Sequence, residues 1–393
     1  MSNAHSANDL KQMQSLPLES KVLMTQQRIR AWYETWKRFE IFDEATGKTR
    51  FETIAVDGWE HPGLKDSEFV NSVLDGQVYV SFSGGKDSTV LKHIVDGMYS
   101  DVPSLFVNTG LEYPEIQAFV REVKAGKYDG FNSDVVILRP AMQFGDVLKN
   151  YGYPIIGKET AKKIQEARNK PDGYAAQSFK ADSERAQKYN GRFSLVRYER
   201  FLHADFKISD KCCDIMKKRP AKTYEKASGR KPILGMLAGE SAKREYYWRK
   251  NGCNAFQNER PQSNPLAFWT EQDVLHYTKK YDVPYCSVYG NIQIKPRGED
   301  TLPGQVDLID YLGCYEQEDT LETTGCNRTG CIFCMFGCHL EKEPNRFQRL
   351  KETHPRQYDY CINGGEMVDG KWQPNKQGLG LGHVLDYIGV KYD

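Results

Sequence analysis

The stretch Gln77-Val78-Tyr79-Val80-Ser81-Phe82-Ser83-Gly84-Gly85-Lys86-Asp87-Ser88 determines how the rest of this 393-residue sequence is interpreted. Its first half is rich in β-branched and aromatic residues, which predicts a strand over Gln77–Phe82. From Ser88 to Met98 apolar residues recur at helical spacing, which predicts a helix. The two adjacent glycines between them therefore belong to a loop at the carboxyl end of a strand.

This loop has the composition of an anion-binding site. Adjacent Gly84 and Gly85 allow consecutive backbone N–H groups to turn toward one anion. The following helix contributes the positive end of its dipole, Lys86 a charge and Ser88 a hydroxyl. The loop is not a Walker A loop, because that pattern requires Gly where Val80 stands and Ser or Thr where Asp87 stands.

Further strands and helices alternate along the chain. The sequence predicts strands over 104–107, 135–138 and 233–237, and helices over 114–125, 143–151 and 240–250. This alternation predicts an α/β fold, with a parallel twisted sheet and helices on both faces. Toward the N-terminus we expect disorder at the start of residues 1–20 and a helix over Lys21–Phe42, where a row of aromatic residues begins.

Composition changes along the chain predict three regions. We expect an N-terminal helical extension over 1–66 and a nucleotide-binding α/β domain over 67–290, with a polar, basic insertion over 157–206. A Cys-rich C-terminal region over 291–393 follows, in which residues 299–322 hold eight acidic residues and no Lys or Arg.

The bulk composition is that of a globular protein in water. The formal net charge is +1 and the hydrophobic fraction is 39%. No apolar run approaches the length that crosses a bilayer, and Met1–Gln14 lacks the apolar stretch of a signal peptide. We therefore expect a cytoplasmic protein without a membrane partner.

Charge is distributed unevenly. Residues 155–250 hold 24 Lys and Arg against 12 Asp and Glu. Such an excess favours a polyanionic partner, either a large nucleotide or a nucleic acid, DNA or RNA. The alternative is an ordinary solvated helical face.

Six of the ten cysteines are clustered. Cys212 and Cys213 are adjacent, and Cys326, Cys331, Cys334 and Cys338 lie within thirteen residues. Structural disulfides are rare in the cytosol, so this clustering indicates a metal or catalysis. Cys253, Cys286, Cys314 and Cys361 are isolated and are expected to be small buried side chains.

Four motifs together carry a family resemblance. Ser83–Ser88 resembles the PP-loop of the adenine nucleotide α-hydrolase superfamily, whose members cleave between the α and β phosphates. The remaining three are similar to segments of phosphoadenosine-phosphosulfate reductases: Asn108-Thr109-Gly110-Leu111-Glu112-Tyr113-Pro114-Glu115, Gly239-Glu240-Ser241-Ala242-Lys243-Arg244 and Asn264-Pro265-Leu266-Ala267-Phe268-Trp269-Thr270-Glu271-Gln272-Asp273-Val274.

The resemblance implies a site for ATP or an adenylyl sulfate, with Mg²⁺. Lys86, Asp87 and Arg244 are the catalytic residues that it implies. The nucleotide would be bound by Ser81, Ser83, Gly84, Gly85, Lys86, Asp87, Ser88, Asn108, Thr109, Gly110, Glu115, Gly239 and Glu240. Glu115 could instead stabilise the first turn of its helix. Arg244 could instead be a charged residue on the surface of a helix.

The paired cysteines resemble those of adenylyl-sulfate reductases, in which a Cys-Cys pair and a later C-x-x-C ligate a 4Fe-4S cluster. Matching residue by residue gives Cys212, Cys213, Cys331 and Cys334, with Cys326 and Cys338 as competing ligands. Structural Zn²⁺ is the alternative, because both metals accept thiolate sets of this kind.

The sequence departs from the reductase pattern in one respect. The family's segment E-C-G-[IL]-H, whose cysteine attacks the sulfate sulfur, is not found, and residues 379–393 contain no cysteine. We therefore favour an enzyme that cleaves ATP to AMP and pyrophosphate and adenylates a substrate for sulfur transfer, as in nucleic-acid thiolation. The alternatives are a sulfonucleotide reductase using Cys338 or Cys361, and a non-catalytic nucleotide-sensing module. A sulfur-donor or reductant protein is an expected partner.

Overall fold

The computed structural model describes residues 5–56, 62–188, 194–295 and 319–393. The chain forms two compact units built from interleaved segments. The first unit comprises residues 1–106, 113–138 and 223–329, and the second comprises 107–112, 139–222 and 330–393. The two units are groups of residues that pack together, which is a different division from the three regions predicted from composition. The domain boundaries expected after residues 66 and 290 stay predictions.

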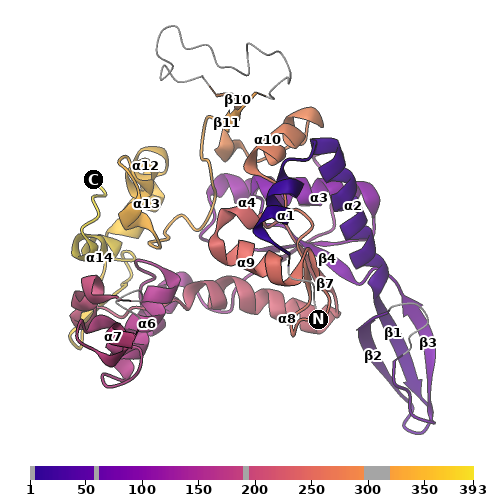
Figure 1. The fold of residues 1–393 in the computed structure, drawn as a ribbon, viewed down its shortest axis with the longest axis horizontal. Helices are drawn as coiled ribbons and strands as arrows, with labels where there is room; N and C mark the ends of the chain where they lie inside the picture. Colours follow the sequence, from indigo (N-terminus) through magenta and orange to yellow (C-terminus); the bar gives the residue numbers. More distant parts are fainter. Residues whose placement is uncertain (1–4, 57–61, 189–193, 296–318) are drawn as a thin grey trace. The chain divides into compact units, whose positions relative to one another are not determined.

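A six-stranded sheet in the order β6-β5-β4-β7-β9-β8 forms the centre of the first unit (Figure 1). Its strands are β4 (Val78–Ser81), β5 (Ser104–Val107), β6 (Val135–Leu138), β7 (Lys231–Leu234), β8 (Asn254–Ala255) and β9 (Gln262–Ser263). Strand β4 pairs in parallel with β5 and β7, and β7 pairs in parallel with β9. Only the short β8 among the described pairings of this sheet is antiparallel. The predicted α/β fold with a mostly parallel sheet is confirmed.

Helices flank this sheet because each buries one apolar side. They are α2 (Leu18–Thr35), α3 (Lys86–Met98), α4 (Pro114–Lys124), α9 (Ala242–Asn251) and α10 (Glu271–Lys280), with short 3₁₀ turns η4 (Ala238–Glu240) and η5 (Ser287–Tyr289). Helix α3 buries Val90, Leu91, Ile94 and Val95, the residues that the helical spacing singled out. Burial of such a stripe is the main stabilising term for a helix in a globular protein.

The strand order places a topological switch point beside the glycine loop. From β4 the chain continues to β5 and β6 on one side, and only later returns to β7 on the other side of β4. Loops at the carboxyl ends of β4 and β7 therefore diverge. In open α/β sheets the crevice between two such loops is where ligands bind.

The N-terminal predictions need two corrections. Residues expected to be disordered contain helix α1 (Ala7–Gln14), which begins at a capping box between Ser6 and Asp9. The helix expected through Phe42 ends at Thr35, and Trp36–Asp43 is strand β1. Aromatic residues satisfy a helical stripe and a strand equally well, and here pairing with two other strands decides the outcome.

Strand β1 is the centre of a separate three-stranded antiparallel sheet (Figure 1). Its partners are β2 (Lys48–Ala55) and β3 (Glu68–Leu74). A small cluster of Phe39, Ile41 and Val56 fills one side of this sheet. The β10 (Ile292–Ile294) and β11 (Leu321–Thr323) hairpin completes the strands described in the first unit.

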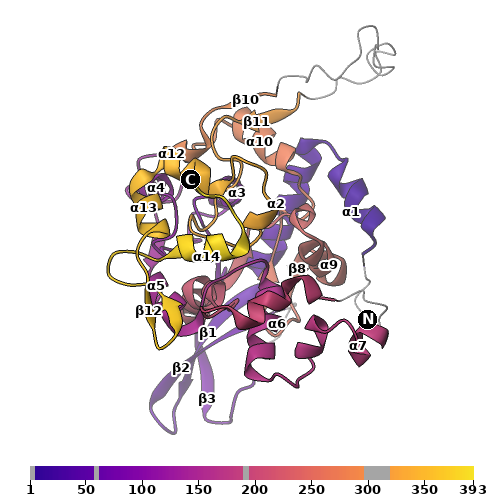
Figure 2. The same ribbon diagram turned by 90° about the vertical axis from the view of Figure 1, so that its left-hand side faces the viewer.

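The second unit is mainly helical (Figure 2). Its elements are α5 (Phe144–Tyr151), α6 (Lys158–Asn169), η1 (Ala176–Phe179), α7 (Glu184–Lys188), η2 (Val196–His203), the π-helical turn η3 (Asp214–Lys218), η6 (Cys338–Leu340), α12 (Arg346–Thr353), α13 (Pro355–Ile362), β12 (Glu366–Val368), β13 (Lys371–Gln373) and α14 (Leu381–Ile388). Helix α8 (Arg219–Ser228) continues η3 and crosses from the second unit into the first. None of the helices described here is long and apolar enough to span a bilayer.

Lys21 joins three helices of the first unit. Its ammonium lies 2.7 Å from the carboxylate of Asp273 and donates to the carbonyl of Gln14 at 2.6 Å. Asp273 is also the N3 residue of the capping box that begins α10 at Thr270. The Lys21 side chain is only 3% exposed, so the pair is shielded from water.

Replacing Lys21 with Met should strongly destabilise the first unit. The carboxylate of Asp273 would lose its buried partner, which costs about 3–5 kcal/mol. Urea-induced unfolding followed by tryptophan fluorescence measures the effect. The control is Lys37→Met, whose pair with Asp75 is exposed and should change the unfolding free energy by about 1 kcal/mol or less. Equal effects of the two substitutions would contradict this account.

Candidate functional site

Two structural constraints require glycine at position 84. Its φ is +71°, in the left-handed region that favours glycine. A Cβ added there would lie 2.9 Å from Ile116 Cγ2 and 3.0 Å from Val120 Cγ2 on helix α4. The loop therefore packs directly on α4, and its turn occurs immediately before α3 begins at Lys86.

Hydroxyl groups of the protein accept hydrogen bonds from three loop amides. The N–H of Ser83 donates to Ser88 Oγ at 3.1 Å, and that of Gly85 donates to Ser83 Oγ at 3.3 Å. The N–H of Lys86 donates to the hydroxyl of Tyr289 at 3.1 Å. The three amides therefore donate to three different hydroxyl groups, and the predicted anion nest stays a prediction.

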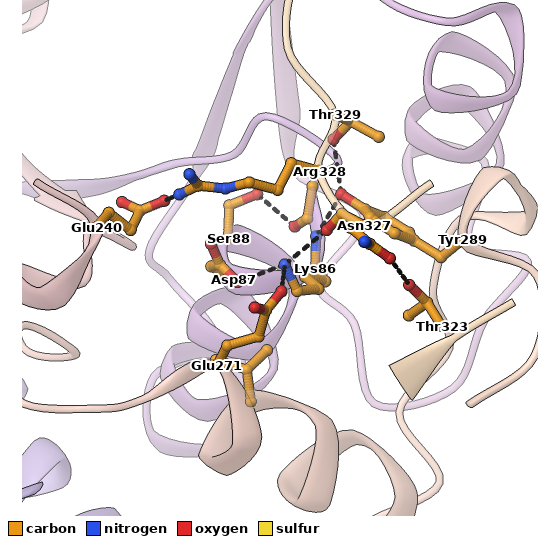
Figure 3. A network of polar contacts seen from close by, with 12 residues as sticks. Lys86, Asp87, Ser88, Glu240, Glu271, Tyr289, Thr323, Asn327, Arg328 and Thr329 are labelled. Carbon is orange, nitrogen blue, oxygen red and sulfur yellow. Dashed lines mark hydrogen bonds and ion pairs between the residues drawn. The ribbon is translucent and has the colours of Figure 1, made fainter. Parts of the chain in front are cut away.

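The Lys86 ammonium is held by oxygen atoms from two distant segments (Figure 3). It lies 2.9 Å from the carboxylate of Glu271, at the start of α10, and donates to the carbonyl of Asn327 at 3.1 Å. Asp87 lies 3.7 Å away. Because the side chain of Lys86 is only 9% exposed, these partners are needed to stabilise its charge.

Two arginines share one carboxylate in the same place. Arg244, on α9, and Arg328 both form ion pairs with Glu240. Burial lowers the pKa of Arg244, and the neighbouring Arg328 lowers it further. Arg244 and Arg328 thus bring two positive charges beside the loop, which Glu240 and the nearby Asp87 oppose.

Two adjoining cavities open at this point. One, of about 180 Å³, is lined by Ser83, Gly85, Lys86, Asp87, Ser88, Gly235, Met236, Glu240, Arg244, Tyr289, Arg328 and Thr329. The other, of about 370 Å³, shares Lys86, Asp87, Glu240 and Arg328 and adds Gln14, Leu237, Gly239, Trp269, Thr270 and Glu271. Both therefore lie at the switch point, between the loops that follow β4 and β7.

The carboxylate of Asp87, which lines both cavities, is buried. Burial raises the pKa of Asp87, and the charge of Lys86 only partly opposes this. Its Oδ1 atom is buried and has no hydrogen-bond partner within the described part of the chain, but it lies 3.7 Å from the ammonium of Lys86.

Most of the predicted phosphate-site residues come together. Ser83, Gly85, Lys86, Asp87, Ser88, Glu240 and Arg244 line one cavity, and Gly239 lines the other. Ser81 is the last residue of β4, and Glu115 lies in the first turn of α4. Asn108, Thr109 and Gly110 belong to the second unit. Their contact with a nucleotide, like that of every predicted residue, stays a prediction.

Among the lining residues that sequence reasoning missed are Glu271, Tyr289, Arg328 and Thr329. Glu271 lies within a segment that resembles the family, but the motif offers no reason to assign it to the phosphate loop. The other three have no local signal, because tertiary folding alone brings them to the loop.

In the second unit, residues 107–112 form a tight polar turn. Thr109 Oγ1 donates to Glu112 at 2.7 Å, and the Thr109 N–H donates to the same carboxylate at 3.0 Å. Glu112 in turn lies 3.7 Å from the ammonium of Lys217. Burial lowers the pKa of Lys217, but Cys331, Glu112 and Cys213 raise it more, so the net shift is upward.

Four of the clustered cysteines lie in the second unit near one another. The Sγ atoms of Cys212 and Cys213 are 3.9 Å apart, and their hydrogen bond raises the pKa of Cys212 and lowers that of Cys213. Burial raises the pKa of Cys331 to about 11, while Cys334 and Cys213 act on the same thiol. The four are therefore close enough to influence one another electrostatically.

The donor set suits a thiolate-bound centre, although its side chains are not arranged around one. Within the described ranges, no group of three or more His, Cys, Asp or Glu side chains is placed to hold a metal ion. Four neighbouring free thiols, with Lys217 beside them, nevertheless supply the soft sulfur donors that iron–sulfur clusters and zinc accept once the thiols are deprotonated.

The two competing cysteines differ in their surroundings. Cys326 belongs to the first unit, and Cys338 is buried in the second, where its thiol donates to the carbonyl of Met335 at 3.1 Å. Of the isolated cysteines, Cys253, Cys286 and Cys361 are buried as expected. Cys314 lies outside the described residues.

The mostly parallel sheet flanked by helices, with a glycine loop at its switch point, defines an α/β protein. The family of the phosphoadenosine phosphosulfate reductase domain matches residues 77–335, well over half of the sequence. The chain therefore belongs to this family.

Other comparisons add less. No match to this chain was found among curated proteins. Among solved structures, the phosphoadenylyl-sulfate reductase of Candida auris, in its phosphate complex, is 16% identical, with a TM-score of 0.28. The match covers 54% of this chain and 75% of that one.

Gly84→Ala should disrupt the loop through steric contact as well as backbone strain. The added methyl group would meet Ile116 and Val120, so we expect a loss of about 1–3 kcal/mol, together with weaker nucleotide binding. Gly126→Ala is the matched control, because Gly126 has a φ of +73° but no neighbour within 4 Å of the added Cβ. Thermal unfolding of both variants separates backbone strain, which both share, from steric overlap, which only Gly84→Ala introduces. An equal loss of stability in the two variants would refute the packing argument.

Proposed function

We propose that this protein binds ATP with Mg²⁺ and cleaves it between the α and β phosphates, transferring AMP to a substrate that then receives sulfur. Family membership restricts the chemistry to adenine nucleotides or their sulfates without choosing between them. The choice of ATP rests on the charges around the loop.

The observation that carries this proposal is the mixture of cations and carboxylates at the phosphate loop. Lys86, Arg244 and Arg328 supply positive charge, and Asp87, Glu240 and Glu271 supply negative charge beside them. Carboxylates this close would repel a bare polyanion. A divalent cation between carboxylate and phosphate oxygens removes that repulsion, so the lining suits a magnesium–nucleotide complex.

The chain's own groups would act on the departing pyrophosphate. An acceptor oxygen attacks the α phosphorus, the bond from that phosphorus to the oxygen bridging the β phosphorus breaks, and pyrophosphate leaves with the electron pair. Lys86, the loop amides and the N-terminus of α3 lie where the added negative charge would be stabilised. In this proposal Asp87 would hold Mg²⁺, because its buried Oδ1 has no hydrogen-bond partner among the described groups and its contact with the Lys86 ammonium is long, at 3.7 Å.

In this proposal Cys212, Cys213, Cys331 and Cys334 hold a 4Fe-4S cluster. When bound, such a cluster would supply electrons or a sulfur-binding iron for the transfer. Cys212 and Cys213 would come from the start of η3, and Cys331 and Cys334 from a turn closed by the Cys334 N–H donating to the Cys331 carbonyl at 3.1 Å.

A nucleic acid is the proposed acceptor. The basic excess over residues 155–250 supports this, and helix α6 presents Lys162 and Lys163 within it. The contact of Lys162 with Glu166 is long, at 3.8 Å, and its side chain is 50% exposed, which leaves this ammonium group accessible to phosphates, whereas Lys163 is only 19% exposed.

Sulfonucleotide reduction is the second candidate, favoured by family membership. It requires a thiolate nucleophile that can reach the substrate. Burial raises the pKa of Cys338 to about 12 and raises that of Cys361 well above its usual value. Both thiols are thus poor nucleophiles as they stand, which is why we place this reaction second.

Pyrophosphate release from ATP should depend on both Mg²⁺ and Asp87. Asp87→Asn removes a carboxylate that would hold the ion, so the rate should fall at least about tenfold at low Mg²⁺ and partly recover at high Mg²⁺. A coupled pyrophosphate assay with candidate nucleic acids measures this, with the exposed Asp75→Asn as control. Thioredoxin-dependent sulfite release from adenylyl sulfate would instead establish the reductase, and tight ATP binding without turnover would indicate a sensing module.

Metal content should depend on the four neighbouring cysteines. After anaerobic purification we expect iron and sulfide in the wild-type protein and their loss in Cys213→Ser and Cys334→Ser, because each removes one thiolate ligand. Cys326→Ser and the buried Cys253→Ala should retain both. Finding zinc without sulfide would indicate a structural zinc site in place of the cluster. Loss of metal only in Cys326→Ser would show that Cys326 is a ligand and that the proposed set of four is wrong.

A further inference from the structure

Residues Asn327, Arg328 and Thr329, which we call the strap, cross the mouth of the phosphate loop (Figure 3). The Asn327 carbonyl accepts from the Lys86 ammonium, and Thr329 Oγ1 lies 2.6 Å from the Tyr289 hydroxyl. That hydroxyl also accepts from the Lys86 N–H. A Cβ on Gly85 would come within 3.3 Å of Thr329 Oγ1, so the strap approaches the loop backbone closely.

The residues just before the strap are anchored independently of any nucleotide. The N–H of Gly325 donates to the Tyr289 carbonyl and that of Cys326 to the Val288 carbonyl, each at 2.9 Å. Thr323 Oγ1 donates to the carbonyl of Cys326 at 3.2 Å. The backbone of the strap therefore follows a segment that is held in place by hydrogen bonds within the protein.

Arg328 is the strap residue that points across the loop. Its guanidinium reaches Glu240, as Figure 3 shows, and the side chain is 60% exposed. Arg328 lines both cavities. Since Glu240 also pairs with Arg244, its single charge cannot neutralise both guanidinium groups.

We propose that Arg328 binds the phosphate chain of the nucleotide, exchanging Glu240 for phosphate oxygens when the site fills. This rests on the proposed function and names a residue and a substrate class for it: nucleotides with consecutive phosphates. A single phosphate is satisfied by the loop amides and Lys86. The second and third cationic groups, Arg244 and Arg328, are useful only to a longer anion, and a guanidinium binds two phosphate oxygens at once.

The test is isothermal titration of the full-length protein with Mg·ATP, Mg·pyrophosphate and AMP. Arg328→Ala should weaken the binding of ATP and pyrophosphate by about tenfold or more and change AMP binding by less than about threefold. Arg328→Lys should be intermediate for ATP, because it keeps the charge and loses the bidentate fork.

Lys127→Ala is the matched control, since Lys127 is 59% exposed and paired with Glu122 in the same unit. It should leave all three affinities unchanged. The inference would be overturned if Arg328→Ala bound ATP and pyrophosphate as tightly as the wild-type protein does. It would also be overturned if the affinity for AMP fell as much as the affinity for ATP. If the wild-type protein fails to bind ATP, the proposed function fails, while the pyrophosphate arm still decides whether Arg328 contacts consecutive phosphates.

Discussion

Everything at this site depends on the tight contact between the glycine loop and helix α4. With Ile116 and Val120 directly beneath Gly84, the backbone has one place to turn, and only a residue without a side chain fits there. Beside this contact, the amides of Ser83, Gly85 and Lys86 donate to hydroxyl groups of the protein, and α3 begins at Lys86. The loop is thus preorganised by packing that involves no ligand.

Charge compensation is the second organising feature. Each cation near the loop has a carboxylate partner within the protein: Lys86 has Glu271, and the two arginines share Glu240. Pairing of this kind lets partly buried charges persist without a ligand, because an isolated buried ion would be far less stable. It also means that an incoming anion exchanges partners with the protein, so the charge and shape of the anion decide whether exchange is favourable.

Local sequence patterns predicted those parts of the fold that local forces determine. Strands β5 and β6 were predicted with the observed ends, because short apolar runs between turn signals have few alternatives. The region around Trp36 was assigned wrongly, since its aromatic spacing fits a helix until β2 and β3 pair with it. Tyr289 and Arg328 could not be predicted at the site, because only the tertiary fold brings Tyr289 to Lys86, 203 positions earlier, and Arg328 to Glu240, 88 positions earlier.

The interleaving of the two units has a consequence for how this protein can be dissected. The chain passes from one unit to the other after residues 106, 112, 138, 222 and 329. Neither unit is a continuous stretch, so truncation at any single peptide bond removes part of one or of both cores. Limited proteolysis should accordingly yield nicked molecules whose fragments stay associated, and expression of either half of the gene alone should give insoluble product.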